Sequence, residues 1–187
     1  MEHHIQLPLT REKAAAIKSG DAVYLTGEIY VARDAAHKRM VELLDEGKEL
    51  PFPVENAAIY YAGPTPAKPG CVIGSAGPTT SSRMDAYAPR LLGLGLRGMI
   101  GKGKRTPEVA AAMKEAGAVY FGVIGGAGAL IASCIKSCEV IAFGDLGTEA
   151  LHRLHVENFP ARVIMDSSGE NLYDTGRRAY LESVAPK

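Results

Sequence analysis

Residues 98–124, GMIGKGKRTPEVAAAMKEAGAVYFGVI, contain the pattern that decides the fold class. The apolar run from Gly98 to Ile100 predicts a short buried strand. Residues 106–116 begin with Thr-Pro-Glu, which gives a helix its cap, its first-turn proline and an acidic first turn. A second apolar run, Val119 to Ile124, predicts the next buried strand. Buried strands joined by helices are typical of an α/β fold with a largely parallel sheet.

The same alternation of strands and helices extends to both sides of this stretch. On the C-terminal side we expect a helix over 127–135, a strand over 139–143, a helix over 148–158, a strand over 161–165 and then a polar helix or tail. On the N-terminal side we expect helices over 11–18 and 34–46 and strands over 22–25, 28–31, 57–62 and 71–73. The strand-rich N-terminal part predicts a mixed sheet, in a single domain that spans residues 1–187.

The composition is that of an ordinary globular domain. The chain has 187 residues, 47% of them hydrophobic and 22% charged, which favours one sizeable core and excludes a disordered chain. Its 21 Lys and Arg residues balance 21 Asp and Glu residues, which argues against binding nucleic acid or an anionic membrane through bulk charge. No signal peptide is visible, and glycines interrupt the longest apolar tract, 119–131. We expect a cytoplasmic protein with no nucleic-acid and no membrane partner.

The three cysteines form no recognisable disulfide or metal pattern. Their odd number is poor for a disulfide framework. Cys134 and Cys138 are spaced i, i+4, whereas metal sites usually place two residues between paired cysteines, and Cys71 stands in an apolar run. We expect all three to be small packing residues and no metal to be bound by this chain.

Two glycine-rich stretches match the residue pattern of phosphate-binding loops but lack the structural context that these loops require. Residues 93–98, GLGLRG, match a dinucleotide fingerprint, but they follow a predicted helix and run into a strand, the reverse of what the motif requires. Residues 98–105 nearly spell a P-loop, but Arg105 stands where Ser or Thr should hold magnesium. Lys102 stays a candidate, because it follows a buried strand, where α/β folds place ligand-binding residues.

Residues 74–85, GSAGPTTSSRMD, favour an anion site. Small hydroxyl residues follow a predicted buried strand and lead into a helix, whose free backbone amides attract anions. Arg83 lies near the first turn, where a cation opposes the helix dipole, so we expect it to meet an external anion. The alternative interpretation is a surface arginine on a capped helix.

Residues 33–37, RDAAH, stand where another predicted strand gives way to a helix. We expect Asp34 to cap this helix and Arg33 to lie at the strand end, above the sheet. His37 falls one turn into the helix and could carry a proton near neutral pH, although a lone helical histidine is more often a surface or packed group. His152 and His155, expected on one side of the 148–158 helix, lack a third ligand, and we interpret them as surface polar residues.

In combination these motifs resemble a known family. The resembling stretches are Thr26-Gly27 through Arg33-Asp34-Ala35-Ala36-His37, Gly77-Pro78-Thr79-Thr80 with Arg83-Met84-Asp85, and Gly101-Lys102-Gly103 with the helix at Thr106. The chain resembles, over roughly residues 5–185, the β subunit of class I iron–sulfur hydro-lyases. These are the two-subunit fumarate hydratases and L-tartrate dehydratases, and the same segment forms the C-terminal domain of single-chain class I fumarases.

The resemblance implies a fold, a partner and a set of site residues. The fold would be a swivelling β/β/α domain, and a separate α subunit would hold a [4Fe–4S] cluster within an assembly of two α and two β subunits, α₂β₂. The substrate would be a dicarboxylate, malate or fumarate first and tartrate second. By position, Arg33, Arg83 and Lys102 would bind the dicarboxylate. Thr79 and Lys102 would be catalytic, with Thr79 beside the carbon that loses its proton.

The physical chemistry of this arrangement is coherent. Removing a proton next to a carboxylate builds negative charge, which fixed cations stabilise most strongly in a dry site. Arginine suits bidentate carboxylate binding, and lysine supplies a compact charge. His37 is a candidate proton relay. The alternative from another class is a non-catalytic anion-binding or assembly module, which co-assembly with a cluster-bearing chain would distinguish from a hydro-lyase subunit that is inactive alone.

Overall fold

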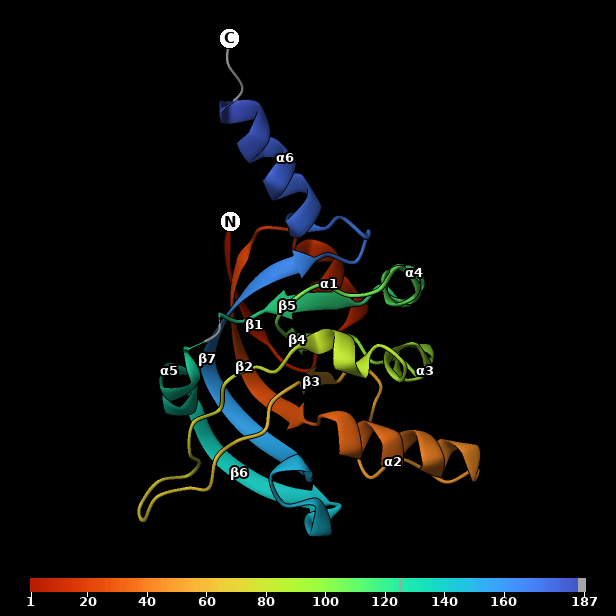
Figure 1. Cartoon of the computed structure of the whole chain (residues 1–187), viewed down its shortest axis with the longest axis vertical. Coiled ribbons are helices and arrows are strands. Elements are labelled where there is room, and N and C mark those ends of the chain that lie inside the picture. Colours follow the sequence, from red (N-terminus) through yellow and green to blue (C-terminus); the bar gives the residue numbers. More distant parts are fainter. Residues whose placement is uncertain (125, 185–187) are drawn as a thin grey trace.

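The computed structural model of the chain describes residues 1–124 and 126–184. Within these residues, seven strands form one sheet in the order β1-β2-β3-β4-β5-β7-β6. Because β2 also pairs with β7, the strands β2, β3, β4, β5 and β7 close into a barrel-like core (Figure 1). The strands are β1 (Glu2–Gln6), β2 (Ala22–Val31), β3 (Ala58–Tyr60), β4 (Gly98–Gly101), β5 (Val119–Gly122), β6 (Ile135–Ala142) and β7 (Leu151–Met165).

The sheet is mixed, as the sequence predicts. The pairings β1–β2, β2–β3, β3–β4 and β4–β5 are parallel. The pairings of β7 with β2, β5 and β6 are antiparallel. The parallel part places the C-terminal ends of β2, β3, β4 and β5 at the same end of the sheet, where α/β folds gather ligand-binding residues.

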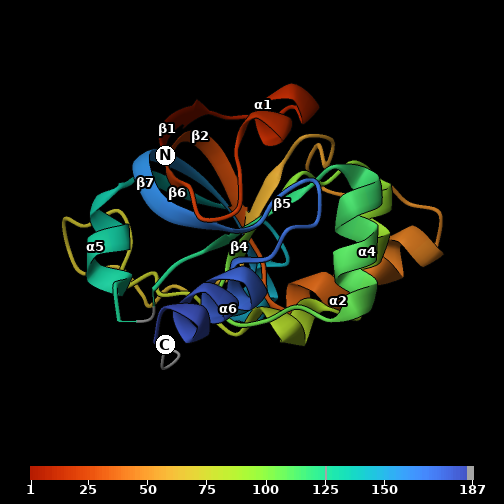
Figure 2. The ribbon, with the colours of Figure 1, turned by 90° about the horizontal axis from the view of Figure 1, so that it is seen from above.

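The helices surround this core unevenly. Helices α2, α3 and α4 lie together on one side of the barrel and α5 lies on another (Figures 1 and 2), while α6 projects from one end of the body (Figure 1). Among the described residues, every helix is too short or too polar to cross a lipid bilayer. The helices are α1 (Arg11–Ala16), α2 (Asp34–Asp45), α3 (Ala88–Gly93), α4 (Pro107–Ala116), α5 (Gly128–Ser133) and α6 (Leu172–Val184), with 3₁₀ segments η1 (Ser81–Met84) and η2 (Gly144–Glu149).

Alternation along the parallel strands builds two hydrophobic clusters. Successive strand residues point to opposite faces, so neighbours in sequence join different clusters. One cluster fills the barrel and includes Tyr60, Ile100 and Phe121. The other packs the outer face of the same strands against α2, α3 and α4, and includes Ile59, Met99 and Tyr120.

The helix starts that the sequence marks most clearly are confirmed. Thr10 caps α1 by accepting a hydrogen bond from the backbone N of Lys13 at 3.4 Å, and Thr106 caps α4 in the same way. Residues 93–98 connect α3 to β4 as the predicted helix-to-strand turn. Helix α2 starts with Asp34 as its first residue, so the cap position falls on Arg33, one residue earlier than predicted. The Asp34 carboxylate is instead paired with a side chain of the site.

The helix predicted over 148–158 is wrong, because most of these residues belong to β7. Leu154 is buried between the exposed residues Arg153 and His155, which is the period-two alternation of a strand. Ladders to β2 and β6 on both sides of β7 stabilise this extended conformation. His152 and His155 therefore face opposite sides of a strand, with His152 buried, and do not share a helix face.

The strand predicted over 71–73 is also wrong. Residues 64–76 form a loop outside the sheet, closed by a hydrogen bond of 3.0 Å from the backbone N of Thr65 to the carbonyl of Ser75. Val72 is 48% exposed and Cys71 is exposed. Three apolar residues are too few to specify a buried strand, and the prolines before them lack the N–H groups that a ladder needs.

Candidate functional site

The ends of three neighbouring parallel strands bring the predicted cationic residues to one region. Arg33 comes shortly after β2, Gly63 lies just beyond β3, and Lys102 follows β4 directly. Because β3 pairs in parallel with both β2 and β4, these ends lie together. Lys102 also forms a parallel bridge with Thr80, and the Lys102 carbonyl accepts a hydrogen bond of 2.9 Å from the backbone N of Ser81.

Thr79 and Arg83 come from the segment that follows the 64–76 loop. The backbone N of Thr79 donates to the carbonyl of Tyr61 at 2.8 Å, which attaches this segment to the end of β3. The turn η1 then places Nη1 of Arg83 3.5 Å from Oγ1 of Thr79. The predicted helix N-terminus is thus a single 3₁₀ turn, and the site presents cationic side chains where the sequence predicted helix amides.

Two carboxylates hold the two arginines. Oδ1 of Asp34 is 2.8 Å from Nε of Arg83. Oε1 of Glu149 is 3.2 Å from Nη2 of Arg33, and Oε2 of Glu149 accepts a hydrogen bond of 3.1 Å from a backbone N–H in the first turn of α2. Oδ2 of Asp34 lies 3.6 Å from Nε of Arg33. The result is a chain of alternating charges, Glu149–Arg33–Asp34–Arg83.

Sequence reasoning missed the role of both carboxylates. From the sequence, Asp34 is expected only to cap a helix, although its position directly after Arg33 also indicates an ion pair at the site. Glu149 was placed in a helix that does not form. It reaches the first turn of α2 from a segment 114 residues away, and no local pattern connects the two.

Gly63 provides the space that the Arg33 side chain occupies. A Cβ atom on Gly63 would lie 2.6 Å from Nη1 and 3.1 Å from Cδ of Arg33, closer than side chains normally approach. A larger residue at this position would therefore displace the guanidinium group. The end of β3 thus shapes the site without contributing a functional side chain.

A buried ion pair fixes the loop that carries Lys102. Nε of Arg105 is 2.6 Å from Oδ1 of Asp85, and the two side chains are 0% and 7% exposed. Oδ2 of Asp85 accepts a hydrogen bond of 2.7 Å from the backbone N of Thr106, and the Tyr120 hydroxyl donates to a backbone carbonyl of the loop at 2.9 Å. Lys102 itself is exposed, so a fixed backbone presents its ammonium group at the surface.

His37 lies behind the site. Its side chain is buried, and its Nδ1 donates a hydrogen bond of 2.9 Å to the carbonyl of Arg33. Burial, with a smaller contribution from the charge of Arg105, lowers the pKa of His37 to about 4, so the ring is neutral at neutral pH. The relay role of His37 stays a prediction, and the geometry favours support of the Arg33 backbone.

The buried His37 makes the stability of the chain depend on pH. In the unfolded chain His37 binds a proton near pH 6.5, whereas in the folded chain it does so only near pH 4. The contribution of His37 to the free energy of unfolding is therefore complete above pH 6.5 and is lost as the pH falls toward 4. We expect a loss of about 2 kcal/mol between pH 7 and 5. Burial also lowers the pKa of His152, which adds a loss of the same sign.

Urea unfolding followed by far-UV circular dichroism at the two pH values tests this prediction. The carboxylates with lowered pKa values, such as Asp21 at about 2, lose their contribution only at lower pH and do not interfere. The His37→Gln variant should lose most of the difference between pH 7 and 5. Equal unfolding free energies for the wild type at both pH values would contradict the prediction.

The cysteines lie on different elements of the fold. Cys71 is in the 64–76 loop, and its exposure contradicts the predicted packing role. Cys134 and Cys138 pack against the barrel core as predicted, and burial raises the pKa of the Cys138 thiol, which disfavours the thiolate that a metal requires. Within residues 1–124 and 126–184, no three His, Cys, Asp or Glu side chains converge as metal ligands. The described residues therefore do not fit an iron–sulfur cluster.

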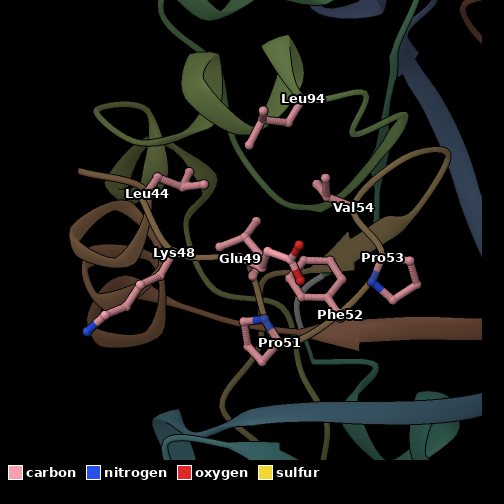
Figure 3. Close-up of a pocket in the computed structure, with 9 residues that line it drawn as sticks. Leu44, Lys48, Glu49, Pro51, Phe52, Pro53, Val54 and Leu94 are labelled. Atoms are coloured by element: carbon pink, nitrogen blue, oxygen red, sulfur yellow. The ribbon is translucent and has the colours of Figure 1, made fainter. Parts of the chain in front are cut away.

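A separate hollow on the described surface lies away from these strand ends. It has a volume of about 610 Å³ and is formed by the end of α2 and the segment after it (Figure 3). Leu44, Phe52, Val54 and Leu94 give it apolar walls, and the ammonium group of Lys48 points away from its centre. It offers no built site for a carboxylate, so the strand ends remain the candidate site.

Fold and contacts together define a mixed α/β domain with a closed barrel-like core, whose cationic side chains gather at the ends of parallel strands. The chain matches the family model described as Fumarase C-terminus over residues 1–176, and it belongs to that family. The family expected from the motifs is thereby confirmed.

Individual relatives differ in how much of their length this chain covers. It is 43% identical over 151 residues to the "Fumarate hydratase class I, anaerobic" of Escherichia coli (strain K12), an alignment that covers 80% of this chain and 28% of that relative. It is 39% identical over 165 residues to "Fumarate hydratase 2" of Leishmania major, covering 87% and 29%. It is 37% identical over 182 residues to the "Putative L(+)-tartrate dehydratase subunit beta" of Methanocaldococcus jannaschii, covering 94% and 93%. The chain thus spans less than a third of these fumarate hydratases and nearly all of the beta-subunit relative.

Proposed function

We propose that the chain is the β subunit of a fumarate hydratase, a hydro-lyase that interconverts malate and fumarate together with a separate α subunit. The observation that carries the proposal is that Arg33, Arg83 and Lys102 lie at one end of the sheet, where Arg83 contacts Thr79, Asp34 lies between the two arginines, and Lys102 bridges to Thr80. The likeness to a relative named as a beta subunit, 37% identical over 182 residues, supports the subunit role.

The cationic groups suit a substrate with two carboxylates. Arg83 uses Nε for Asp34, and Arg33 uses Nη2 for Glu149. Each guanidinium has five N–H donors in a planar fork, so further donors are present for a substrate carboxylate. Lys102 adds a compact charge on a mobile side chain. Each arginine is therefore held on one side by the protein and binds substrate with the other.

The same charges favour the chemical step. Removal of a proton from the carbon next to a carboxylate moves negative charge onto that carboxylate, and fixed cations stabilise the charge as it develops. The Arg83 side chain is 48% exposed in the chain alone, so water weakens its field. A partner that covers this end of the sheet would exclude water and strengthen the interactions. The proposal therefore includes that the chain alone is inactive.

Thr79 is proposed as the group that abstracts the proton, with Lys102 as its catalytic partner. A threonine hydroxyl is a weak base, and Nη1 of Arg83, 3.5 Å from Oγ1, favours its ionised form. Replacing Thr79 by alanine in the assembled complex should lower kcat by about 100-fold to 10,000-fold, the range of general base catalysis. Thr79→Ser keeps the hydroxyl and should keep most of the activity. Steady-state dehydration of malate measures both, and near-normal turnover by Thr79→Ala would remove Thr79 from the mechanism.

The partner and its cofactor belong to the same proposal. We place a [4Fe–4S] cluster on the α subunit, because the described residues of this chain offer no ligand set for it. The α₂β₂ stoichiometry and a cytoplasmic location rest on the resemblance and the composition. The swivelling β/β/α classification is likewise part of the proposal and is supported by the closed barrel-like core with its flanking helices.

L-Tartrate is the second candidate substrate. The specific observation that favours it is the name of the beta-subunit relative, which this chain covers almost completely. Tartrate carries the same two carboxylates, so the cations of this chain would bind it equally well. Residues near the substituents of the central carbons must discriminate between malate and tartrate. In this proposal some of those residues belong to the partner subunit.

Anaerobic co-expression with a candidate α chain tests the proposal. The purified complex is assayed with malate, where fumarate is followed by its absorbance, and with L-tartrate, where the keto acid formed is trapped and measured. Turnover of malate supports the proposal, and turnover of tartrate alone changes the substrate while keeping the mechanism. A stable, cluster-loaded complex that acts on neither would favour a non-catalytic anion-binding or assembly module.

A further inference from the structure

The connection between β6 and β7 delivers a carboxylate to the site from outside the parallel strands. Its 3₁₀ segment η2 contacts α2, and Asp145 at its start pairs with Arg39 on α2 at 2.7 Å. The guanidinium of Arg39 also lies over the ring of Phe143, 5.6 Å from its centroid. In Figure 1 the connection is at the lower ends of β6 and β7, near the first turn of α2. Glu149 is the last residue of this segment.

We propose that Glu149 is a positioning residue that orients Arg33 for binding a substrate carboxylate; this inference rests on the proposed function. Glu149 uses both carboxylate oxygens, one for Nη2 of Arg33 at 3.2 Å and one for a backbone N–H of α2 at 3.1 Å. The second contact fixes the carboxylate to the helix that Arg33 precedes. Glu149 and Arg33 are therefore held by the same turn of backbone.

The position of Glu149 determines which side of the Arg33 guanidinium faces the substrate carboxylate. With Nη2 turned toward Glu149, Nη1 lies in the space beside Gly63, at the end of β3. The nearest carboxylate oxygen of Asp34 is 3.6 Å from Nε, and that nitrogen has no hydrogen bond. Glu149 is thus the closest anionic partner of Arg33. Holding a long side chain in its binding conformation lowers the entropy lost when substrate binds.

Glu149→Gln in the assembled complex tests the inference. The amide keeps the size of the side chain and its acceptor for the α2 backbone but loses the charge that attracts Arg33. We expect KM for the dicarboxylate to rise by about 10-fold to 100-fold, the effect of losing a hydrogen bond to a charged group. We expect kcat to change by less than about threefold, because Arg33 keeps its charge in the bound complex and loses only its fixed orientation before substrate binds.

Asp145→Asn is the matched control. It removes a charge from the same connection and loosens the contact with Arg39, but it leaves the neighbours of Arg33 unchanged. Its KM and kcat should stay within about twofold of the wild type. An equal rise of KM in both variants would show that docking of the connection matters and not the Glu149 charge, and would overturn the inference.

The outcomes separate this inference from the proposed function. An inactive wild-type complex rejects the function, whereas an active complex with an unchanged KM in Glu149→Gln rejects only the positioning role. A second readout uses the chain alone and needs no activity. The side-chain Nε–H resonance of Arg33, assigned with an Arg33→Lys variant, should shift or broaden in Glu149→Gln and stay unchanged in Asp145→Asn. An unaffected resonance in Glu149→Gln would also overturn the inference.

Discussion

Replacing Arg83 by alanine in the assembled complex is expected to lower kcat/KM for malate by about 30-fold to 5,000-fold. Removing one partner of a closely paired, desolvated charge costs about 2–5 kcal/mol, and Arg83 pairs with the substrate in the proposed site. In the chain alone the side chain is 48% exposed and contacts Asp34 and Thr79. The folded chain should therefore lose about 1 kcal/mol or less, as is usual for exposed ion pairs.

Arg90→Ala is the control for this experiment. Arg90 on α3 is 50% exposed and pairs with Asp45 at 2.7 Å, so it matches Arg83 in exposure and in ion pairing but lies outside the site. Steady-state kinetics of both variants, with the same partner chain and the same cluster content, make the comparison. Arg90→Ala should leave kcat/KM within about twofold of the wild type. Similar values for the two variants would remove Arg83 from the substrate site.

Asp85→Asn is expected to destabilise the chain by about 3–5 kcal/mol. Asp85 is the carboxylate partner of the fully buried Arg105, and it also accepts from the backbone N of Thr106. Asparagine can keep a hydrogen bond but leaves the Arg105 charge buried without a counter-charge, which costs more than the loss of a surface pair. The loop that carries Lys102 would lose its anchor at the same time.

Urea unfolding at neutral pH, followed by far-UV circular dichroism, measures this effect. Asp45→Asn is the matched control, because Asp45 pairs with Arg90 on the surface, and it should change the unfolding free energy by about 1 kcal/mol or less. If Asp85→Asn fails to fold, the double variant Asp85→Leu/Arg105→Met should recover stability, since an apolar replacement of a buried pair is often neutral. A loss below about 1 kcal/mol in Asp85→Asn would contradict the buried-pair interpretation.

Local signals explain which parts of the fold the sequence predicts. The caps of α1 and α4 and the apolar runs of β4 and β5 are decided by neighbouring residues, and these elements are confirmed. Strand β7 is different, because its conformation depends on ladders to β2 and β5, which are distant in sequence, as well as on the ladder to the neighbouring β6. The alternation of polar and apolar residues around Leu154 indicates a strand, but the sequence was interpreted as a helix. The 71–73 error has the opposite cause, because that apolar run has no partner strand in the fold.

The site shows the same division between local and distant information. The location of Arg33 and Lys102 at the ends of parallel strands could be predicted, because each comes soon after an apolar strand in the sequence. Arg83 was found from its unfavourable place in a predicted helix start, although that helix is a 3₁₀ turn. Glu149 could not be predicted, because only the folded β6–β7 connection brings it to Arg33. The roles of all the predicted site residues stay predictions: Arg33, His37, Thr79, Arg83 and Lys102.

The most direct test of the central claim is a titration of this chain into a fixed amount of anaerobically prepared, cluster-loaded α chain. The rate of fumarate formation from malate is measured at each ratio. Half of the active site is proposed to lie at the strand ends that carry Arg33, Arg83 and Lys102. We therefore expect no turnover by either chain alone and a rate that rises to a plateau at equal amounts of the two chains. Full turnover by the α chain without this chain would contradict the account.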